Sequence, residues 1–437
     1  MKNSLIIEIP AGKTTKLTKY WLVLAVMSLA AAGIFSLPPV IFRGSFFANM
    51  LPIEKIFDTS LIVHVDLSVL VWFLAIGGLL MSLLAKENFF SLYKTNFILA
   101  ALGTALIALA PFTGGYAIKN NYIPTLNNLT FFLGLSFFAC GILFQCAITL
   151  TSYQQIKDNV LKIGIFITAV IVLVAFICFV IAHNTIPTPL SQDDLQSYYE
   201  ALFWGGGHVL QFAYISLMAI AWLWLSEICN VKIKLPTKFI LMLFVLNMLI
   251  ILPSPFFYMS ENTRDLFTQQ MRAFCGISPL FIGASIFLGA FNKNNSSDNK
   301  IIKSCLIISI ILFGYGGALG YMISGTNVTI PAHYHGSIIA ITIAFIGFAY
   351  HLLPQLGFGK ISGKMASCQP YVYGIGQIMH ITGLAWMGGY GALRKAAGTS
   401  HEIHTVAGKA LFFSGGALAI TGGLLFVIVA IRALLKK

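Results

Sequence analysis

Four histidines lie in hydrophobic segments of the chain, at a spacing that suits the binding of flat metal cofactors. His333 and His335 are two residues apart in Pro-Ala-His-Tyr-His-Gly, and the other two are His64 and His208. Residues at positions i and i+2 of an α-helix project about 200° apart. One metal ion could not easily bind both side chains, whereas two planar cofactors on opposite sides of the helix could each bind one. Haem is therefore the first cofactor that this pattern indicates.

The composition shows which elements must position these histidines. The 437 residues are 58% hydrophobic and 9% charged, with a mean hydropathy of +0.85, which excludes an ordinary soluble domain. A transmembrane helix needs about 20 apolar residues. Twelve runs are long enough, near residues 20–42, 60–84, 95–118, 126–150, 160–182, 199–226, 237–259, 268–291, 301–324, 330–356, 370–391 and 406–434.

The connections between these runs are short, so the sequence predicts no extramembrane domain. We predict an all-α membrane protein whose residues 1–437 form a single twelve-span domain, with residues 1–19 as a cytoplasmic tail. The first run follows a lysine-bearing N-terminus and is longer than a typical signal peptide, which favours its retention.

The basic residues predict the orientation of the spans. Of the 27 Lys and Arg residues, 19 lie on the two termini and the loops after even-numbered spans, and 8 lie on the opposite side. Cytoplasmic loops are enriched in Lys and Arg, so both termini are expected in the cytoplasm of a bacterial-type inner membrane. The net charge of +13 then follows from topology and does not indicate nucleic-acid binding.

The cysteines agree with this orientation. None of the seven lies in a predicted outer loop, so we expect no disulfide. The chain also has no Cys-x-x-Cys-His motif, which excludes a covalently attached c-type haem.

The predicted topology brings the four histidines to one level of the membrane. His64 opens the second span, His208 lies in the sixth, and the His333 pair opens the tenth. All three helices run inward from the outer side, so at about 1.5 Å per residue every imidazole lies in the outer half. A single intramembrane histidine more often bonds between helices than binds metal. Four histidines at one depth favour metal ligation, because ionisable groups in lipid are costly and usually have a function. This argument is weakest for His208.

These features resemble the catalytic subunit of the haem-copper oxidase superfamily, which includes cytochrome c oxidases and nitric oxide reductases. The shared pattern is twelve spans, a His at the outer end of the second, Gly-His on the sixth and His-aromatic-His on the tenth. Asn-Thr-Arg-Asp-Leu-Phe-Thr at 262–268 is similar to a stretch that follows the family's copper ligands. Segment 369–398, with Gln-Pro-Tyr-Val-Tyr-Gly and Gly-Ala-Leu-Arg-Lys, resembles the family's eleventh span and next loop. The resemblance implies a bundle of the cytochrome oxidase subunit I type.

The resemblance also implies roles for the histidines. His64 and His335 would be the axial ligands of a low-spin haem. His333 would be the proximal ligand of a second, high-spin haem that is open to substrate on its other face. Two b-type or related haems are therefore expected.

Three further positions match the family pattern. His208 corresponds to the sixth-span histidine that binds copper, and with His333 it would form the catalytic centre. Arg394 and Lys395 lie where the family has basic residues on haem propionates, although a solvated outer-loop pair is an equal interpretation. The Gly-Gly-Gly before His208 predicts close packing of a helix or of haem.

The chain departs from the family pattern at two places, and the first argues against a normal copper site. The two other copper ligands of the family would fall at about Leu252 and Pro253, and residues 252–259 contain no His, Asp, Glu or Cys. One imidazole alone does not hold copper. The tyrosine that the family has four residues after the sixth-span histidine is Phe212 here, with Tyr258 as another candidate.

Two classes of function follow. The first is an oxidoreductase that passes electrons from the low-spin to the high-spin haem and reduces O2 or NO in a respiratory chain, supplied by a c-type cytochrome or another donor subunit on the outer side. The alternative is a copper-less haem-binding sensor, electron-transfer or assembly protein without terminal oxidase turnover. A solute transporter is disfavoured, because transport requires no layer of imidazoles.

Overall fold

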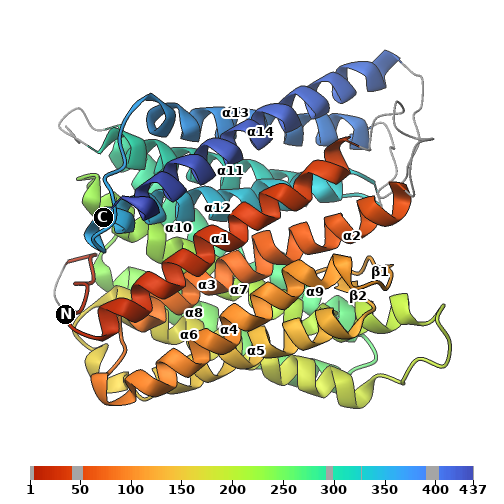
Figure 1. Cartoon of the computed structure of the whole chain (residues 1–437), viewed down its shortest axis with the longest axis horizontal. Helices are drawn as coiled ribbons and strands as arrows, with labels where there is room; N and C mark the ends of the chain where they lie inside the picture. The colour runs from red at the N-terminus through yellow and green to blue at the C-terminus, as the bar shows by residue number, and fades with distance from the viewer. Residues whose placement is uncertain (1–3, 42–52, 292–298, 326, 390–402, 437) are drawn as a thin grey trace. The chain divides into compact units, whose positions relative to one another are not determined.

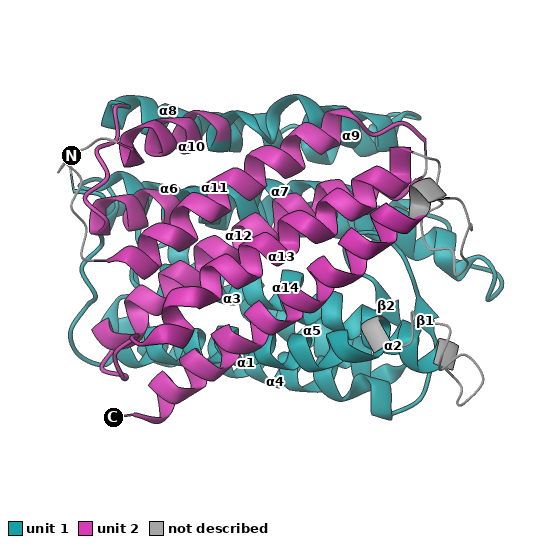
Figure 2. Ribbon diagram, turned by 90° about the horizontal axis from the view of Figure 1, so that it is seen from above, with its two compact units in different colours: residues 1–220, 235–279 teal, residues 221–234, 280–437 magenta. Residues whose placement is uncertain are grey.

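The computed structural model describes residues 4–41, 53–291, 299–325, 327–389 and 403–436, and most of them are helical (Figure 1). The chain divides into two compact units, drawn in teal and magenta in Figure 2. Unit 1 comprises residues 1–220 and 235–279, and unit 2 comprises residues 221–234 and 280–437. The boundary therefore falls within the long helix α7 (Leu195–Ile228) and near the start of α10 (Ile277–Ala290).

Unit 1 contains the first nine α-helices, of which α7 belongs to it only up to residue 220. Besides α7 its elements are α1 (Thr14–Ile41), α2 (Ile53–Val65), the π-helical turn η2 (Asp66–Val71), α3 (Trp72–Ser82), η3 (Glu87–Phe89), α4 (Phe90–Leu109), η4 (Ala110–Phe112), β1 (Ala117–Ile118), β2 (Thr125–Leu126), α5 (Leu129–Leu150), η5 (Tyr153–Gln155), α6 (Val160–Thr185), α8 (Thr237–Ile251), η6 (Ser254–Met259) and α9 (Thr263–Phe274). Unit 2 contains nearly all of α10 together with α11 (Lys300–Tyr321), α12 (Thr329–Gln355), α13 (Lys364–Gly389) and α14 (Ile403–Leu435).

The predicted all-α membrane bundle is confirmed. Within the described residues, eleven segments are long and apolar enough to cross a bilayer. The remaining predicted span is α13, which is as long as its neighbours but includes several Gly, Gln and Tyr residues that lower its hydropathy. Four of these spans are built from pieces that follow one another, namely Lys55–Ser82, Glu87–Phe112, Thr237–Met259 and Thr263–Ala290.

The connection between the third and fourth spans differs from the prediction. The apolar run ended near residue 118, but α4 stops at Leu109, because Pro111 and then Gly114 and Gly115, with φ of 91° and 86°, do not continue a helix. The chain instead forms the hairpin of β1 and β2, with Ala117 opposite Leu126.

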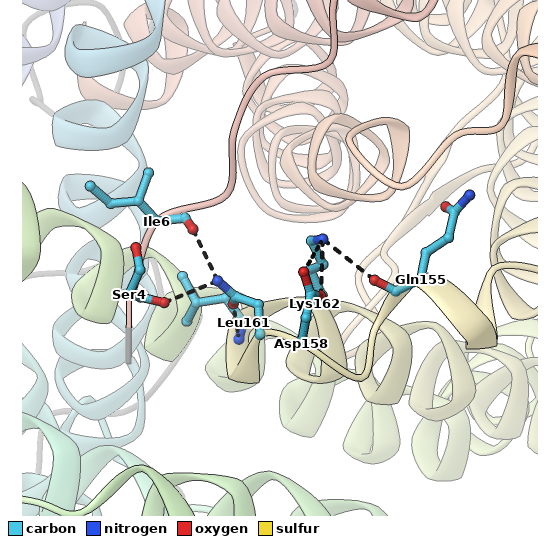
Figure 3. Close-up of polar contacts among 7 residues, drawn as sticks. Ser4, Ile6, Gln155, Asp158, Leu161 and Lys162 are labelled. Atoms are coloured by element: carbon cyan, nitrogen blue, oxygen red, sulfur yellow. Dashed lines mark hydrogen bonds and ion pairs between the residues drawn. The ribbon is translucent and has the colours of Figure 1, made fainter. Parts of the chain in front are cut away.

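The N-terminal segment is tied to the start of α6 by one side chain (Figure 3). The Asn159 amide Nδ2 donates to the carbonyls of Ser4 and Ile6, both at 3.0 Å. Its Oδ1 accepts from the Leu161 N–H at 2.8 Å and so caps α6. Leu5 and Ile7 are buried beside this clamp. Part of the predicted cytoplasmic tail is therefore packed structure.

Glycines allow α4 and α5 of unit 1 to approach closely. A Cβ at Gly141 would lie 2.6 Å from the carbonyl oxygen of Asn96 and 2.7 Å from the backbone nitrogen of Ala100. Small residues at such crossings are typical of helix packing in membranes. The neighbouring backbone atoms cannot move without moving α4.

We predict that Gly141→Ala destabilises unit 1 by about 1–3 kcal/mol, because the new methyl group overpacks the α4–α5 crossing. The matched control is Gly33→Ala in α1, where nothing lies within 4 Å of the added carbon. That control should be neutral or slightly stabilising. Thermal unfolding in detergent measures both, and equal midpoints for the two variants would contradict this packing.

Candidate functional site

His64 and His333 are held in the same way, although they lie in different units. The His64 Nδ1 is 2.8 Å from the Ala32 carbonyl oxygen on α1, and the His333 Nδ1 is 2.7 Å from the Gly316 carbonyl oxygen on α11. A carbonyl can only accept a hydrogen bond, so each Nδ1 carries the hydrogen and each Nε2 carries the lone pair. A histidine oriented in this manner is prepared to bind a metal through Nε2.

Close packing of α11 against α12 makes the bond of His333 possible. A Cβ at Gly316 would lie 2.6 Å from the Ser337 nitrogen, and a Cβ at Gly320 would lie 2.7 Å from the Nδ1 and Cε1 atoms of the His333 ring. Without side chains at these positions, α11 brings its backbone carbonyl within reach of the imidazole. The ring orientation of His333 is thus set by two glycines of the neighbouring helix.

His335 contacts a different helix from His333. Its ring centroid is 5.2 Å from that of His380 on α13, with the ring planes at 72°. The His380 Nδ1 donates to the Phe412 carbonyl on α14 at 3.0 Å. The two imidazoles of α12 therefore reach towards α11 and α13, as expected for positions i and i+2. His380 lies midway along the apolar run at 370–391, and no motif of the sequence distinguishes it.

The structure places the predicted site residues in two groups. His64 and His208 belong to unit 1, whereas His333 and His335 belong to unit 2. Arg394 and Lys395, predicted near haem propionates, lie outside the described residues.

His208 is engaged through both ring nitrogens. It is 1% exposed, its Nδ1 donates to the Trp204 carbonyl at 2.7 Å, and its Nε2 is 2.9 Å from the Tyr122 hydroxyl. Because Nδ1 must carry the hydrogen, Nε2 is the acceptor and Tyr122 is the donor. A metal could bind His208 only by displacing one of these partners.

Tyr122 reaches His208 from the loop of the β1–β2 hairpin. Its φ of 67° is in the left-handed region, which is uncommon for a residue with a side chain. The adjacent Asn121 fixes this conformation, because its N–H donates to the Glu200 carboxylate at 2.8 Å and its side-chain amide donates to the same group. Lys119, earlier in the hairpin, pairs with Asp58 of α2 at 2.7 Å.

Trp204 and Arg264 complete the surroundings of Glu200. The Arg264 guanidinium is 3.5 Å from the Glu200 carboxylate and lies over the Trp204 ring at 4.3 Å. The Trp204 indole N–H donates to the Arg264 carbonyl at 3.2 Å. Glu200, Trp204 and His208 are spaced by four residues along one face of α7. The N-terminal part of α7 thus joins a partly exposed ion pair to a buried imidazole.

The three glycines before His208 each make room for aromatic side chains. A Cβ at Gly205 would meet Tyr258 and Phe267, one at Gly206 would meet Phe179, and one at Gly207 would lie 2.5 Å from the Tyr122 Cβ. The predicted close packing at this motif is therefore packing of aromatic rings. The sequence did not indicate Tyr122, because it lies in a segment between two predicted spans.

The residues around His208 do not fit copper. Within the residues that the structure describes, no three His, Cys, Asp or Glu side chains come together as a possible metal site. Both nitrogens of His208 are engaged, and residues 254–259 form the 3₁₀ turn η6, which contains no His, Cys, Asp or Glu. Phe212 is fully buried at the position where the family has its tyrosine.

The residues around His64 and His333 do fit haem. Neutral imidazoles with a lone pair on Nε2 are ordinary iron ligands, and a bond from Nδ1 to a backbone carbonyl is their usual support. Asp66, two residues after His64, is 1% exposed, and neither of its oxygens has a hydrogen-bond partner among the described residues. Such an atom marks a place for ordered water or a bound group. Asp66 is the first residue of the π-helical turn η2, and among the described residues its side chain neither caps the helix nor bonds to His64.

Comparisons with known proteins agree with the resemblance inferred from the histidines. The family model of Cytochrome C and Quinol oxidase polypeptide I matches residues 16–419. An uncharacterized protein of Rickettsia prowazekii (strain Madrid E) is 30% identical, with 94% of each chain aligned. Another, of Aquifex aeolicus (strain VF5), is 29% identical over 80% of this chain and 88% of its own.

A solved structure has a similar fold. A heme-copper terminal oxidase dimer determined by cryo-electron microscopy matches with a TM-score of 0.78 and 16% sequence identity, over 98% of this chain and 85% of that chain. At this identity the likeness shows the fold alone.

We predict that Tyr122→Phe destabilises unit 1 by about 1–3 kcal/mol, because the buried Nε2 of His208 loses its donor. The control is Tyr116→Phe in the same connection, where the side chain is 38% exposed. That change should shift the unfolding midpoint little. Thermal unfolding in detergent compares the two, and equal midpoints would show that the Tyr122 bond contributes nothing.

Proposed function

The chain belongs to the Cytochrome C and Quinol oxidase polypeptide I family, and on that premise we propose that it is a di-haem redox protein of a respiratory chain. His64 and His335 would hold a low-spin haem, and His333 would hold a high-spin haem. The observation that carries this proposal is the shared bond from Nδ1 of His64 and His333 to a carbonyl of a neighbouring helix. When bound, haem supplies one-electron chemistry and, with one axial position open, a site for a diatomic molecule.

The protein's own residues would position and separate the two sites. His333 and His335 are separated by a single residue, Tyr334, and contact different helices, which suits ligands of two cofactors. The Gly316 carbonyl keeps the His333 ring from turning, and Gly320 leaves room for that ring. The outer half of α12 would thus hold two irons in a fixed arrangement.

No step of this proposal uses copper, because the surroundings of His208 do not fit it. Tyr122 donates to the Nε2 of His208, and the carbonyl of Trp204 accepts from its Nδ1. The imidazole is therefore a neutral hydrogen-bonding group that holds the β1–β2 hairpin on α7. The membrane location and the haem-copper oxidase relationship favour O2 or NO as the diatomic molecule, with a c-type cytochrome or another donor subunit on the outer side.

The two hydrogen bonds that engage both nitrogens of His208 favour a second candidate function. A haem on His333, in a protein whose His208 is not free to bind copper, could bind a diatomic molecule without reducing it, as a sensor, electron-transfer or assembly protein would. The two candidates differ in turnover.

Single substitutions test the haem assignments. We predict that His335→Ala and His64→Ala each remove the low-spin haem spectrum and leave CO binding to the reduced protein intact. His333→Ala should abolish CO binding and leave the low-spin spectrum. The control is His183→Ala, which changes an exposed histidine bonded only to Tyr198 in the described structure. Loss of CO binding in His335→Ala with its retention in His333→Ala would show that the roles are reversed.

Turnover separates the two candidate functions. We predict that the reduced protein consumes O2 or NO in repeated cycles and that His333→Ala lowers the rate at least tenfold, because the open haem would be lost. An oxygen electrode and an NO electrode measure this directly. A haem-loaded protein that binds CO but consumes neither gas would favour the sensor or electron-transfer function.

A further inference from the structure

His380 is oriented by α14 in the same manner as His64 and His333 are oriented by their neighbouring helices. Its Nδ1 donates to the Phe412 carbonyl at 3.0 Å, so its lone pair lies on Nε2. The Phe412 ring packs against the imidazole, with the ring centroids 4.3 Å apart and the planes at 30°. The hydrogen bond therefore sets the tautomer of His380, and the ring contact holds the plane of its imidazole.

The close approach of α14 to α13 in unit 2 makes this orientation possible (Figure 2). A Cβ at Gly415 would meet the backbone nitrogen of His380, and a Cβ at Gly416 would lie 3.3 Å from its Nδ1. Small residues at helix crossings in membranes let the backbones approach in this way. One nitrogen of His380 is thus committed to α14, and the other carries the lone pair at a different corner of the ring.

His335 of α12 is an imidazole that contacts His380. Their ring centroids are 5.2 Å apart, and the ring planes are at 72°. An N–H hydrogen bond spans about 2.9 Å and each ring nitrogen lies about 1.1 Å from its ring centre, so a bond in line with both centres separates them by about 5.1 Å. Because such a bond leaves the twist between the two rings open, the angle of 72° is compatible with it.

We propose that His380 is a positioning residue for the low-spin haem, an inference that rests on the proposed function because it takes His335 as a haem ligand. The Nδ1–H of His335 donates to the Nε2 of His380, while the Nε2 of His335 binds the iron. A metal-ligating histidine almost always donates its other ring N–H to an acceptor. His64 and His333 each donate to a backbone carbonyl, whereas His335 donates to a second imidazole.

The imidazole acceptor changes how strongly the iron holds an electron. A ring nitrogen is a more basic acceptor than an amide carbonyl, and hydrogen bonds in a chain polarise one another. The chain from His335 through His380 to the Phe412 carbonyl makes His335 a more basic ligand, which favours ferric iron and lowers the reduction potential. His333 has the weaker acceptor, the Gly316 carbonyl. The difference favours electron transfer from the low-spin to the high-spin haem.

Redox titration of the haem-loaded protein, followed through the low-spin visible spectrum, tests this role. His380→Leu removes the acceptor and should weaken the preference for ferric iron about tenfold, which raises the midpoint potential by about 59 mV for a one-electron couple. His380→Gln retains an acceptor oxygen and should give a smaller positive shift. The control is Thr382→Val, which removes the 3.0 Å bond of α13 to Tyr315 on α11 and should leave the potential unchanged.

The same variants distinguish failure of this inference from failure of the proposed function. Equal potentials for the original protein and His380→Leu would overturn the role of His380 and leave the haem assignments intact. A low-spin spectrum that persists in His335→Ala but is lost in His380→Leu would make His380 the ligand and overturn both.

His380→Gln decides the question where the leucine variant does not accumulate as folded protein. Its ferric electron paramagnetic resonance spectrum reports the bond between iron and imidazole, which a general loosening of α13 would not change. We expect this spectrum to shift together with the potential. A spectrum and a potential identical to those of the original protein would overturn the proposal.

Discussion

The proposed chemistry depends on one simple constraint, which is that a backbone carbonyl accepts a hydrogen bond and never donates one. Where a carbonyl of a neighbouring helix faces the Nδ1 of a histidine, the imidazole must keep its hydrogen there and its lone pair on Nε2. Ala32 does this for His64, and Gly316 does it for His333. The helix packing therefore selects the tautomer that can bind iron. The glycines of α11 matter because they let the carbonyl of Gly316 approach.

The same constraint leads to the opposite result at His208. Its Nδ1 is also held by a carbonyl, that of Trp204, but its Nε2 accepts from Tyr122. The difference lies in the β1–β2 hairpin, which Glu200 and Asp58 hold against α7 and α2. A site that binds copper elsewhere in the superfamily is here closed by a phenol and aromatic rings. A member of the oxidase family can thus retain the imidazoles suited to haem while lacking a place for the second metal.

Much of the fold could be predicted from sequence, because long apolar runs must become helices in a bilayer. The runs at 160–182 and 237–259 correspond closely to observed elements, and the histidine pattern indicated the family that the comparisons then showed. Hydropathy does not mark where a short polar connection turns, so the hairpin at 117–126 was missed. Tyr122 lies in this hairpin and was missed for the same reason. Its bond to His208 joins residues 86 positions apart. No sequence pattern showed which helix supplies a carbonyl to each imidazole.

The most direct test of this account is the metal and haem content of the purified protein, counted per polypeptide. The arrangement of His64, His333 and His335 predicts two haem irons, and the closed surroundings of His208 predict copper well below one atom per chain. Copper at one atom per chain would contradict the interpretation of His208. Absence of haem from protein isolated from its native membrane would contradict the account as a whole.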